Sequence, residues 1–414
     1  MNLVNNSPSM QLRHLFTVTS GSTPESGKPE YWDGDIAWAT PEDVSQVDGY
    51  VLRDTRRKIT PAGYASCGTS LARPGAIILT KRAPIGQLAV LGLDACSNQG
   101  CVLLSPRVGV DSRFYYYVLC SQAARLQALG RGSTFMELSI DDLKAIQVPA
   151  VGGRAQQSVA DYLDRETGRI DGLIAAKQQL LELLLEKRRA IIATAVTRGI
   201  AASAAMRDSG IPWLGEVPAH WEIERARWLF RERDVRSETG DEEMLTVSHI
   251  TGVTPRSEKD VNMFEAETNE GYKVCLPADL VINTLWAWMG AMGIAPMKGI
   301  VSPAYNVYET GPRLEPSYID ALVRLPIFAQ EVTRYSKGVW SSRLRLYPEG
   351  FFEVYLPVPP REEQRAIVEQ IARATAKLDN VRAATERTVT LLKERRAALI
   401  AAAVTGQIDV GKAA

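Results

Sequence analysis

Two stretches far apart in the chain are nearly the same: LLEKRRAIIATAVT at Leu184–Thr197 and LKERRAALIAAAVT at Leu392–Thr405. They are separated by 208 residues (392 − 184). At the same offset, and without a gap, Gln156 falls on Gln364 farther upstream. A fixed self-similarity of this kind indicates that one structural unit occurs twice. The repeat therefore decides how the rest of the chain is interpreted.

Each copy of the repeat contains a long segment typical of an α-helix. Residues from about Gln156 to Thr197 include no proline and are rich in Ala, Leu, Glu, Gln, Lys and Arg, which favour helices. Gly199 follows this segment, where a glycine commonly ends a helix. The second segment, Arg361 to Val404, lies between Pro359-Pro360 and Gly406. The sequence predicts two helices of about 40 residues each.

An apolar series with a seven-residue spacing runs along each predicted helix, and such a series is typical of a coiled-coil seam. Its middle member is polar in both copies, Lys177 in the first and Thr385 in the second. We expect the two seams to pair as an antiparallel coiled coil in a pseudo-two-fold repeat; the alternative is that each helix packs on its own neighbouring domain. The helix-pairing residues are Leu163, Ile170, Leu184, Ile191, Ile371, Leu378, Leu392 and Leu399.

The segments between the helices differ from them in pattern. Residues 10–150 and 206–358 carry short β-rich runs punctuated by Gly, Pro, Asn and Asp. Near their starts, Arg13–Phe16 resembles Arg227–Phe230 at an offset of 214 (227 − 13), so the first segment is about six residues longer (214 − 208). We expect an α+β fold in which two mostly-β domains alternate with two long helices. The expected parts are 1–150, 151–200, 201–358 and 359–414.

Composition and charge narrow the possible functions only a little. Lys plus Arg and Asp plus Glu both total 48 among 414 residues, so the formal net charge is zero. A net charge of zero does not indicate nucleic-acid binding, because phosphate binding comes largely from basic groups. The five cysteines form no C-x-x-C pair, and three histidines provide no zinc-ligand spacing. We expect a cytoplasmic protein with buried thiols, no metal, no signal peptide and no membrane span.

The common motifs of DNA enzymes are missing. No G-x-x-x-x-G-K-[ST] phosphate loop is present, and no Asn/Asp-Pro-Pro-Tyr/Phe motif of amino-methyltransferases occurs. The nearest match, Val358-Pro359-Pro360, lacks the amide or carboxylate that grips a base. Scattered histidines make a His-based triad hard to assemble. The sequence therefore predicts no catalytic residue and a chain that is not itself an enzyme.

Several short motifs, in order and over nearly the whole chain, resemble the specificity subunits of type I restriction–modification systems. None is specific alone, but the ordered set together with the repeat is. The first copy departs from the pattern at Ala155, where the second has Glu363, and at Arg198, where the second has Gly406, which puts only the first helix's boundaries in doubt. The motifs are Gly21–Pro24, Tyr31–Trp38, Arg82–Gly86, Asn98–Gly100, Gly132–Thr134, Ser209–Trp221, Leu356–Ile367 and Leu392–Gly406.

The resemblance implies a division of labour. Each target recognition domain would read one half of a split double-stranded DNA target, and the helices would set the spacer between the halves. Methylation subunits, two being the expected number, would dock on the helices and bring S-adenosylmethionine, while motor-nuclease subunits bring ATP and Mg; no cofactor is expected on this chain. Two joined repeats can imitate a two-fold dimer, and a dimer of matching domains reads a palindrome. Because the two domains diverge here, we expect an asymmetric target.

Candidate DNA contacts follow from the chemistry of base recognition. Asn and Gln pair with adenine, and Arg and Lys pair with guanine. The alternative for each is a solvated loop residue, and for Asn98-Gln99 also a buried amide pair that ties loops together. Asn306 lies 208 residues after Asn98 (306 − 98). The candidates are Lys81, Arg82, Asn98, Gln99, Arg131, Ser133 and Thr134 in the first domain, and Lys298, Tyr305, Asn306, Lys337, Ser341, Ser342 and Arg343 in the second.

Two other features have a simpler interpretation. Trp32 and Trp38 could stack on bases, but core packing is favoured. The arginine run from Arg225 to Arg236 is interleaved with acids, which indicates a charge-laced face rather than a phosphate strip. Two other functions compete with the specificity subunit: a coiled-coil scaffold that binds protein, and a methyltransferase or nuclease with unrecognised motifs.

Overall fold

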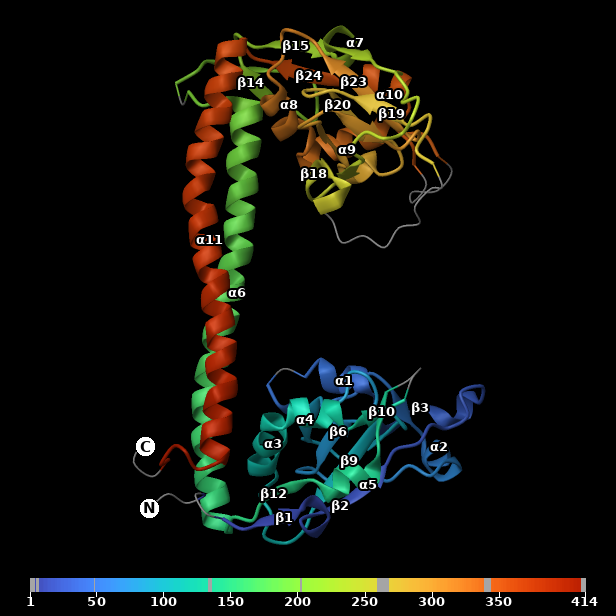
Figure 1. The fold of residues 1–414 in the computed structure, drawn as a ribbon, viewed down its shortest axis with the longest axis vertical. Coiled ribbons are helices and arrows are strands. Elements are labelled where there is room, and N and C mark those ends of the chain that lie inside the picture. The colour runs from blue at the N-terminus through green and yellow to red at the C-terminus, as the bar shows by residue number, and fades with distance from the viewer. Residues whose placement is uncertain are drawn as a thin grey trace. The chain divides into compact units, whose positions relative to one another are not determined.

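The computed structural model describes residues 4, 7–47, 49–132, 136–201, 203–258, 268–338 and 344–410. The chain forms two compact units, the first made of residues 1–179 and 385–414 and the second of residues 180–384. Each unit combines strands with helices, which confirms the expected α+β class (Figure 1).

Two helices are much longer than all other described elements. Helix α6 (Gly153–Arg198) has 46 residues, and helix α11 (Arg361–Val404) has 44. Both correspond to the predicted helical segments. The glycines just beyond them, Gly199 and Gly406, have φ angles of 76° and 74°. Only glycine adopts this left-handed conformation readily, so both helices end where the sequence provides one.

The first unit is built around a five-stranded sheet in the order β2-β9-β6-β7-β4, antiparallel except for the β4–β7 pair. A separate three-stranded sheet has the order β5-β3-β8, in which β3 is antiparallel to β5 and parallel to β8. The elements are β1 (Ser9–Gln11), β2 (Phe16–Ser20), β3 (Trp32–Ala39), α1 (Pro41–Ser45), β4 (Val51–Leu52), β5 (Lys58–Ile59), α2 (Pro61–Ser66), β6 (Ile77–Thr80), β7 (Leu88–Leu91), β8 (Ala95–Ser97), β9 (Cys101–Pro106), α3 (Ser112–Ser121), α4 (Ala123–Ala128), β10 (Gly130–Arg131), β11 (Glu137–Leu138), α5 (Ile140–Ala145) and β12 (Gln147–Pro149).

The second unit is built around a four-stranded antiparallel sheet in the order β16-β23-β20-β21. Its elements are β13 (Met206–Asp208), β14 (Glu216–Pro218), β15 (Glu222–Arg225), α7 (Ala226–Leu229), β16 (Phe230–Glu232), β17 (Leu245–Ser248), β18 (Gly252–Pro255), β19 (Lys273–Cys275), β20 (Leu280–Asn283), the 3₁₀ turn η4 (Ala287–Met289), β21 (Met292–Ile294), β22 (Gly299–Val301), β23 (Tyr305–Thr310), α8 (Pro316–Val323), α9 (Pro326–Tyr335), α10 (Pro348–Phe352) and β24 (Tyr355–Val358).

The two sheets have the same strand order when matching strands are compared, β2 with β16, β9 with β23, β6 with β20 and β7 with β21. The offsets between matching strand starts are 214 for β2 and β16 (230 − 16), 203 for β6 and β20 (280 − 77) and 208 for β12 and β24 (355 − 147). The first copy is thus 11 residues longer before the central strand (214 − 203), and the second is 5 longer after it (208 − 203). The six-residue difference in the sequence is the net of these two.

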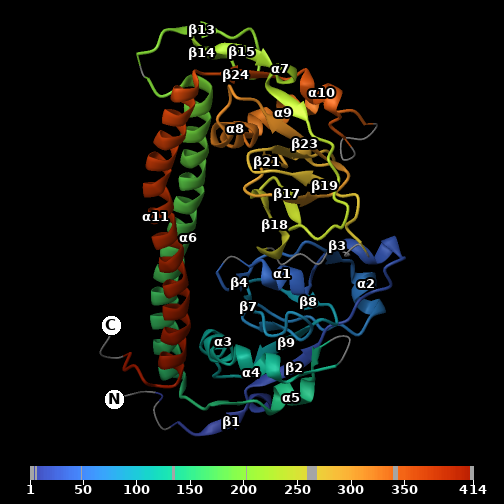
Figure 2. The ribbon, with the colours of Figure 1, turned by 45° about the horizontal axis from the view of Figure 1, so that its top comes forward.

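In the first unit, α3 lies between the sheet and α6 (Figures 1 and 2). The core there contains Phe114 and Tyr115 of α3 together with Leu163 of α6. Ile400 and Val404 from the end of α11 are part of the same core. Burial of these side chains contributes roughly 1.5–3 kcal/mol each. The end of one long helix and the start of the other thus complete a single core.

The second unit repeats this arrangement with α8 in the place of α3. The hydroxyl of Tyr318 on α8 donates to the carbonyl oxygen of Val196 on α6 at 2.8 Å, and α8 also packs against β21 (Figure 2). Val196 of α6 and Ile367 of α11 lie in the same core as Tyr318. Here the roles of the helices are reversed, because α6 contributes its end and α11 its start.

Matching glutamines hold the start of each long helix. Gln156 accepts from the backbone N–H of Asp111 at 2.7 Å and donates to the carbonyl of Val151 at 2.6 Å. Gln364 accepts from the N–H of Glu315 at 2.7 Å and donates to the carbonyls of Arg313 and Pro359. Both amides are buried. Gln156 thereby ties the start of α6 to the backbone just before α3, and Gln364 ties the start of α11 to the backbone just before α8.

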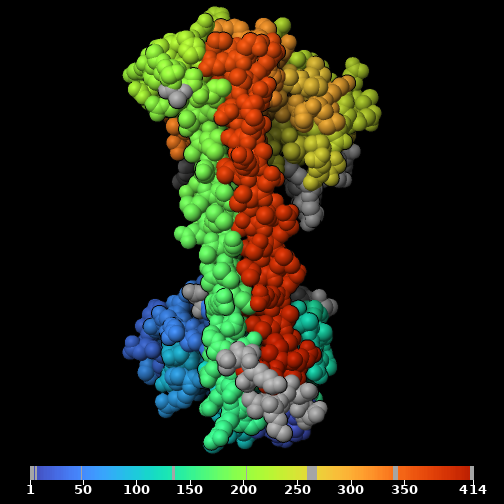
Figure 3. Space-filling model, turned by 90° about the vertical axis from the view of Figure 1, so that its left-hand side faces the viewer, coloured from blue at the N-terminus to red at the C-terminus, as the bar shows by residue number. Residues whose placement is uncertain are grey.

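The long helices contact each other inside each unit. In the first unit Arg396 of α11 forms a two-pronged ion pair with Asp171 of α6, at 2.8 and 3.1 Å. In the second unit Arg188 of α6 pairs with Asp379 of α11 at 3.4 Å. In both units one face of α6 and α11 is exposed (Figure 3).

Two smaller expectations are confirmed. Trp32 and Trp38 are buried and meet edge to face at 5.1 Å, with the guanidinium of Arg57 3.6 Å from the Trp32 ring. Most of the arginine run is neutralised, for example Arg233 by Asp279 at 2.8 Å. Among the helices that the structure describes, none is long and apolar enough to cross a membrane.

Candidate nucleic-acid interface

Three loops of the first unit lie side by side because backbone hydrogen bonds link them. The N–H of Lys81, at the end of β6, donates to the carbonyl of Gly100 at 2.8 Å. The carbonyl of Lys81 accepts from the N–H of Leu138 at 2.8 Å. Residues 81–87, 98–100 and the described parts of 130–138 therefore form one group, which we call loop cluster 1. Of the first domain's candidates, it contains Lys81, Arg82, Asn98, Gln99 and Arg131.

The two cations at the start of loop cluster 1 share one acidic partner. The ammonium of Lys81 lies 2.5 Å, and the guanidinium of Arg82 3.0 Å, from the carboxylate of Glu137. The hydrogen bond from Lys81, followed by the contact with Arg82, holds the pKa of Glu137 below its usual range. Lys81 is buried, whereas Arg82 is exposed. Both must exchange or share this carboxylate before they can bind a phosphate or a base.

Asn98 and Gln99, at the turn between β8 and β9, make different contacts. The side-chain oxygen of Asn98 accepts from the N–H of Gly100 at 3.0 Å, which closes the turn locally. The Gln99 side chain is exposed and accepts from the hydroxyl of Thr23. Gly21 lies so close that a Cβ there would be 2.1 Å from the carbonyl oxygen of Asn98. The Gly-Ser-Thr-Pro motif thus packs against this turn, and Gln99 is its outward side chain.

Arg131 is the most exposed cation of loop cluster 1. Its guanidinium lies 3.2 Å from Asp142, and 77% of its side chain is exposed. Two further candidates in this loop, Ser133 and Thr134, lie outside the described residues.

The second unit has a matching group of loops, which we call loop cluster 2. The N–H of Tyr305 donates to the carbonyl of Ser302, as the N–H of Cys101 does to Asn98. The N–H of Leu346 donates to the carbonyl of Thr284, as that of Leu138 does to Lys81. Loop cluster 2 contains residues 284–291, 302–304 and the described parts of 337–346.

The strand register changes the interpretation of Asn306. It lies inside β23 opposite Ile282, and it is only 8% exposed. Its side-chain oxygen accepts from the buried ammonium of Lys273 at 3.3 Å. Because β9 and β23 start 204 residues apart (305 − 101), the residue matching Asn98 is Ser302 (98 + 204), and the match at 208 is wrong. Asn306 has a structural hydrogen bond within the sheet.

The remaining candidates of the second domain are spread out. Tyr305 is half-buried and its hydroxyl accepts from the amide of Asn283 at 3.0 Å. Lys298 is exposed but lies at the end of β22 away from the turn at Ser302. Lys337 is exposed within loop cluster 2. Ser341, Ser342 and Arg343 lie outside the described residues.

None of the eight side chains predicted to pair the helices is exposed. Leu163 and Ile170 are buried. The other six are half-buried: Leu184, Ile191, Ile371, Leu378, Leu392 and Leu399. By contrast Leu173, Leu183 and Leu391, which are outside the seven-residue series, are more than 40% exposed.

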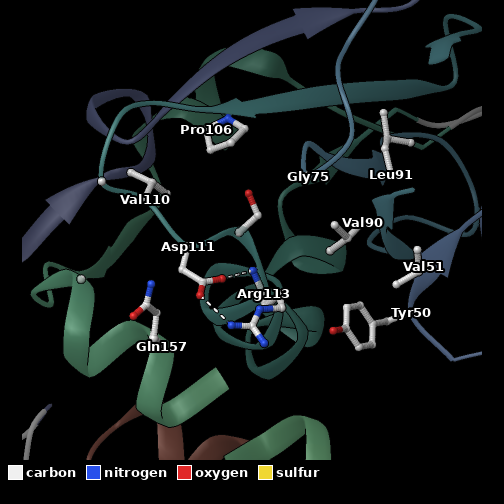
Figure 4. Close-up of a pocket in the computed structure, with 13 residues that line it drawn as sticks. Tyr50, Val51, Gly75, Val90, Leu91, Pro106, Val110, Asp111, Arg113 and Gln157 are labelled. Carbon is white, nitrogen blue, oxygen red and sulfur yellow. Dashed lines mark hydrogen bonds and ion pairs between the residues drawn. The ribbon is translucent and has the colours of Figure 1, made fainter. Parts of the chain in front are cut away.

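A pocket of about 630 Å³ lies where the first unit's sheet meets the start of α6 (Figure 4). Its cation, Arg113, is neutralised by Asp111, Asp161 and Asp164 at 2.8–3.0 Å. Burial, and then the nearby Asp164 carboxylate, raises the pKa of Tyr50 to about 12. The pocket therefore offers no free cation to a phosphate, and its polar side chains hold α3 to α6. No cluster of metal ligands occurs among the described residues.

Sequence reasoning missed four residues of these loop clusters. The sequence gives no signal for Glu137, because a DNA surface is expected to be basic. It gives none for Leu285 and Trp286, because base reading is expected mainly from polar side chains. Arg345 could have been found from the repeat, since it lies 208 residues after Glu137 (345 − 137).

The comparisons with known proteins agree with this arrangement. A family model for the type I restriction modification DNA specificity domain matches residues 6–183. The type I restriction enzyme MjaIX specificity subunit of Methanocaldococcus jannaschii is 33% identical over 176 residues, 42% of this chain and 40% of that protein. The putative type I specificity subunit S.MgeORF438P of Mycoplasma genitalium is 32% identical over 80 residues, 19% of this chain and 21% of that protein. The match thus spans less than half the length of these relatives.

Solved structures extend the likeness to the whole fold. A chain from a structure on complex assembly and conformational transition of the type I R-M system has a TM-score of 0.68 at 16% identity, over 98% of this chain and 99% of that one. The HsdS subunit from Thermoanaerobacter tengcongensis has a TM-score of 0.50 at 16% identity, over 97% of both chains. Residues 6–183 therefore resemble the type I restriction modification DNA specificity domain, and nearly the whole chain shares the fold of these two structures.

Proposed function

We propose that this chain is the non-catalytic DNA specificity subunit of a type I restriction–modification complex. Each recognition domain reads one half of a split, asymmetric double-stranded target through its loop cluster. The long helices set the spacer and dock the methylation subunits. Methylation and cleavage, with S-adenosylmethionine, ATP and Mg, belong to the partner subunits.

The duplicated loop cluster is the observation that carries this proposal. Two sheets of one strand order present matching turns, and the same backbone hydrogen bonds join those turns to a following hairpin. Side chains on loops held by a rigid sheet can vary without disturbing the core, which suits the reading of different sequences. A catalytic centre would require convergent reactive groups instead.

The two ion pairs support an antiparallel coiled coil with two-fold character. Asp171 and Arg396 are matched by Asp379 and Arg188 at the offset of 208 (379 − 171 and 396 − 188). The residue numbers of each pair add up to 567 (171 + 396 and 188 + 379), as they must when two helices run antiparallel in one register. A chain built in this way can present its two domains to DNA as a dimer presents its subunits.

The contrast between the loop clusters supports an asymmetric target. At matching positions the first has Lys81 and Arg82, and the second has Thr284 and Leu285. Different side chains at the same place recognise different base edges. The two half-sites are therefore expected to differ in sequence.

Exposed leucines support docking on the helices. Leu173 is 46%, Leu183 55% and Leu391 63% exposed on the long helices, and Figure 3 shows that one face of each long helix is uncovered. Apolar side chains exposed along a helix are typical of a partner surface. The methylation subunits are the partners proposed for it.

Mapping of methylated bases in DNA from cells that express this chain with its methylation subunit tests the proposal. The wild type should give a split, asymmetric motif. Replacing Asn98 and Gln99 by alanine should lower stringency in one half only, while the control Gln157→Ala, an exposed glutamine outside the loop cluster, leaves the motif unchanged.

Absence of any split motif from a folded complex with an active methylation subunit would make the proposal wrong and favour the protein-binding scaffold. Binding of S-adenosylmethionine by the isolated chain would instead favour an enzyme.

A further inference from the structure

The register of the two sheets defines which loop residues match. Thr80 lies opposite Cys101 in the first sheet, and Asn283 lies opposite Tyr305 in the second. The residues that follow, Lys81 and Thr284, both accept at their carbonyls from a leucine of the next hairpin. Arg82 and Leu285 therefore occupy equivalent positions, one residue farther along.

The residue before that leucine has opposite charge in the two domains. In the first it is Glu137, whose carboxylate pairs with both Lys81 and Arg82. In the second it is Arg345, next to Leu346. At these positions the first domain has two cations that pair with one carboxylate. The second domain has one cation, Arg345, and two uncharged residues, Thr284 and Leu285.

Arg345 has no acidic partner within the described part of the chain. Its backbone is fixed by two hydrogen bonds with Lys337, both 2.9 Å, so the side chain starts from a defined position. Its guanidinium lies 5.9 Å from the ring of Tyr347, and it is half-buried. A guanidinium with free donors on a fixed backbone is prepared for a planar acceptor.

Large apolar side chains are exposed close to Arg345 in the chain and on the anchored loop that begins at Thr284, whose carbonyl accepts from the N–H of Leu346. Leu285 is 42%, Trp286 50% and Tyr347 42% exposed. The loop is held because the hydroxyl of Thr284 donates to the carbonyl of Ala304 at 2.7 Å and the indole of Trp288 donates to the carbonyl of Leu285 at 3.0 Å. Exposed apolar groups on a rigid loop indicate a contact that is absent in the free chain.

We propose that Arg345 is a specificity-determining residue of the second recognition domain, which reads a guanine while Leu285 and Trp286 contact the neighbouring thymine methyl group. This inference rests on the proposed function. Arginine donates two hydrogen bonds to O6 and N7 of guanine, and the thymine methyl is the apolar feature of the major groove. Unlike Lys81 and Arg82, Arg345 breaks no ion pair with a described residue when it binds.

The experiment uses the complex of the full chain with its methylation subunit and maps methylated sites in genomic DNA. In Arg345→Ala, discrimination at one G·C position of one half-site should fall roughly tenfold or more, with the other half unchanged. Trp286→Ala should relax a neighbouring A·T position. The control is Arg334→Ala, on α9, whose side chain is 60% exposed and pairs with Glu331.

Arg345→Lys separates base reading from simple charge. It keeps the positive charge and a donor that can reach guanine but loses the planar two-pronged fork, so its discrimination should fall between that of the wild type and that of the alanine variant. A lysine variant with full wild-type discrimination would overturn two-pronged reading of a guanine by Arg345. An unchanged motif in Arg345→Ala would overturn it as well.

These outcomes are distinguishable from failure of the proposed function. If wild type gives a split motif and Arg345→Ala does not alter it, only the inference fails. If the wild type gives no split motif, the proposed function itself fails. Circular dichroism of each variant identifies a loss of folding, and a folded Arg345→Lys protein keeps the test decisive.

Discussion

At the scale of single residues, the buried glutamines at the helix starts are expected to matter for stability. Gln156→Ala leaves the N–H of Asp111 and the carbonyl of Val151 without their partner. An unsatisfied buried group costs about 1–3 kcal/mol. We therefore expect the free energy of unfolding of the first unit, measured in urea, to fall by at least this amount. The neighbouring exposed Gln157→Ala should change the free energy of unfolding by less than about 0.5 kcal/mol. Equal effects of both variants would contradict this role.

The Glu137 ion pairs predict a pH dependence of a definite sign. Lys81, then Arg82, lowers the pKa of Glu137 from its usual 4.5, so its contribution to stability is present above pH 4.5. It is lost as the pH falls through the lowered folded-state pKa. The difference in free energy of unfolding between wild type and Glu137→Gln should therefore be largest near neutral pH and shrink in acid. Urea titrations of both proteins across this range measure it, and a constant difference would argue against the pairing.

At the scale of elements, the side chain of Asp164 joins α6 to α3. Its carboxylate accepts from Tyr117 at 2.8 Å, from Arg113 at 2.9 Å and from Tyr50 at 3.2 Å. Asp164→Ala should destabilise the first unit by about 1–3 kcal/mol, because the buried hydroxyl of Tyr117 loses a strong acceptor.

Asp161→Ala is the matched control. Asp161 contacts Arg113 from the same helix but is 66% exposed. We expect an effect below about 1 kcal/mol, as for other exposed ion pairs. Hydrogen exchange of α3 in the two variants compares them directly, and faster exchange in both to the same degree would refute the special role of Asp164.

The two interhelical ion pairs should differ in strength because their geometries differ. Arg396 makes two contacts with Asp171 and is 27% exposed, whereas Arg188 makes one longer contact with Asp379 and is 42% exposed. Double-mutant cycles to alanine should give a coupling of about 1 kcal/mol for the first pair and close to zero for the second. The reverse order would mean that the pairs do not act as the geometry indicates.

The sequence predicted the elements more fully than the interface. Both helices follow from composition and from terminal glycines such as Gly199, because these are local signals. The pairing of β9 with β6 is non-local, so the count of residues along the chain misplaced Asn306 by four positions relative to Asn98. Insertions fall in loops, and a single offset cannot show that one domain is longer before its central strand and the other after it.

At the scale of the whole molecule, the proposed asymmetry of the target is attributed to the two loop clusters alone. A chain in which the second recognition segment is replaced by a copy of the first, joined at the matching positions before β1 and β15 and after β12 and β24, should give a palindromic motif with an unchanged spacer. Methylation mapping measures both properties at once. An asymmetric motif from such a chain would mean that residues outside these segments read bases.

The core of the first unit has a consequence for how the protein is made. Ile400 and Val404 complete a core with members such as Phe114 and Leu163, which precede them by more than 200 residues. At about 5–20 residues per second, the 205 residues between (384 − 179) take a ribosome roughly 10–40 s. Protease sensitivity of ribosome-bound chains that stop before residue 385 should exceed that of the released protein. The domain synthesised first is thus the last to complete its core, and its apolar face stays open until the end of α11 has been made.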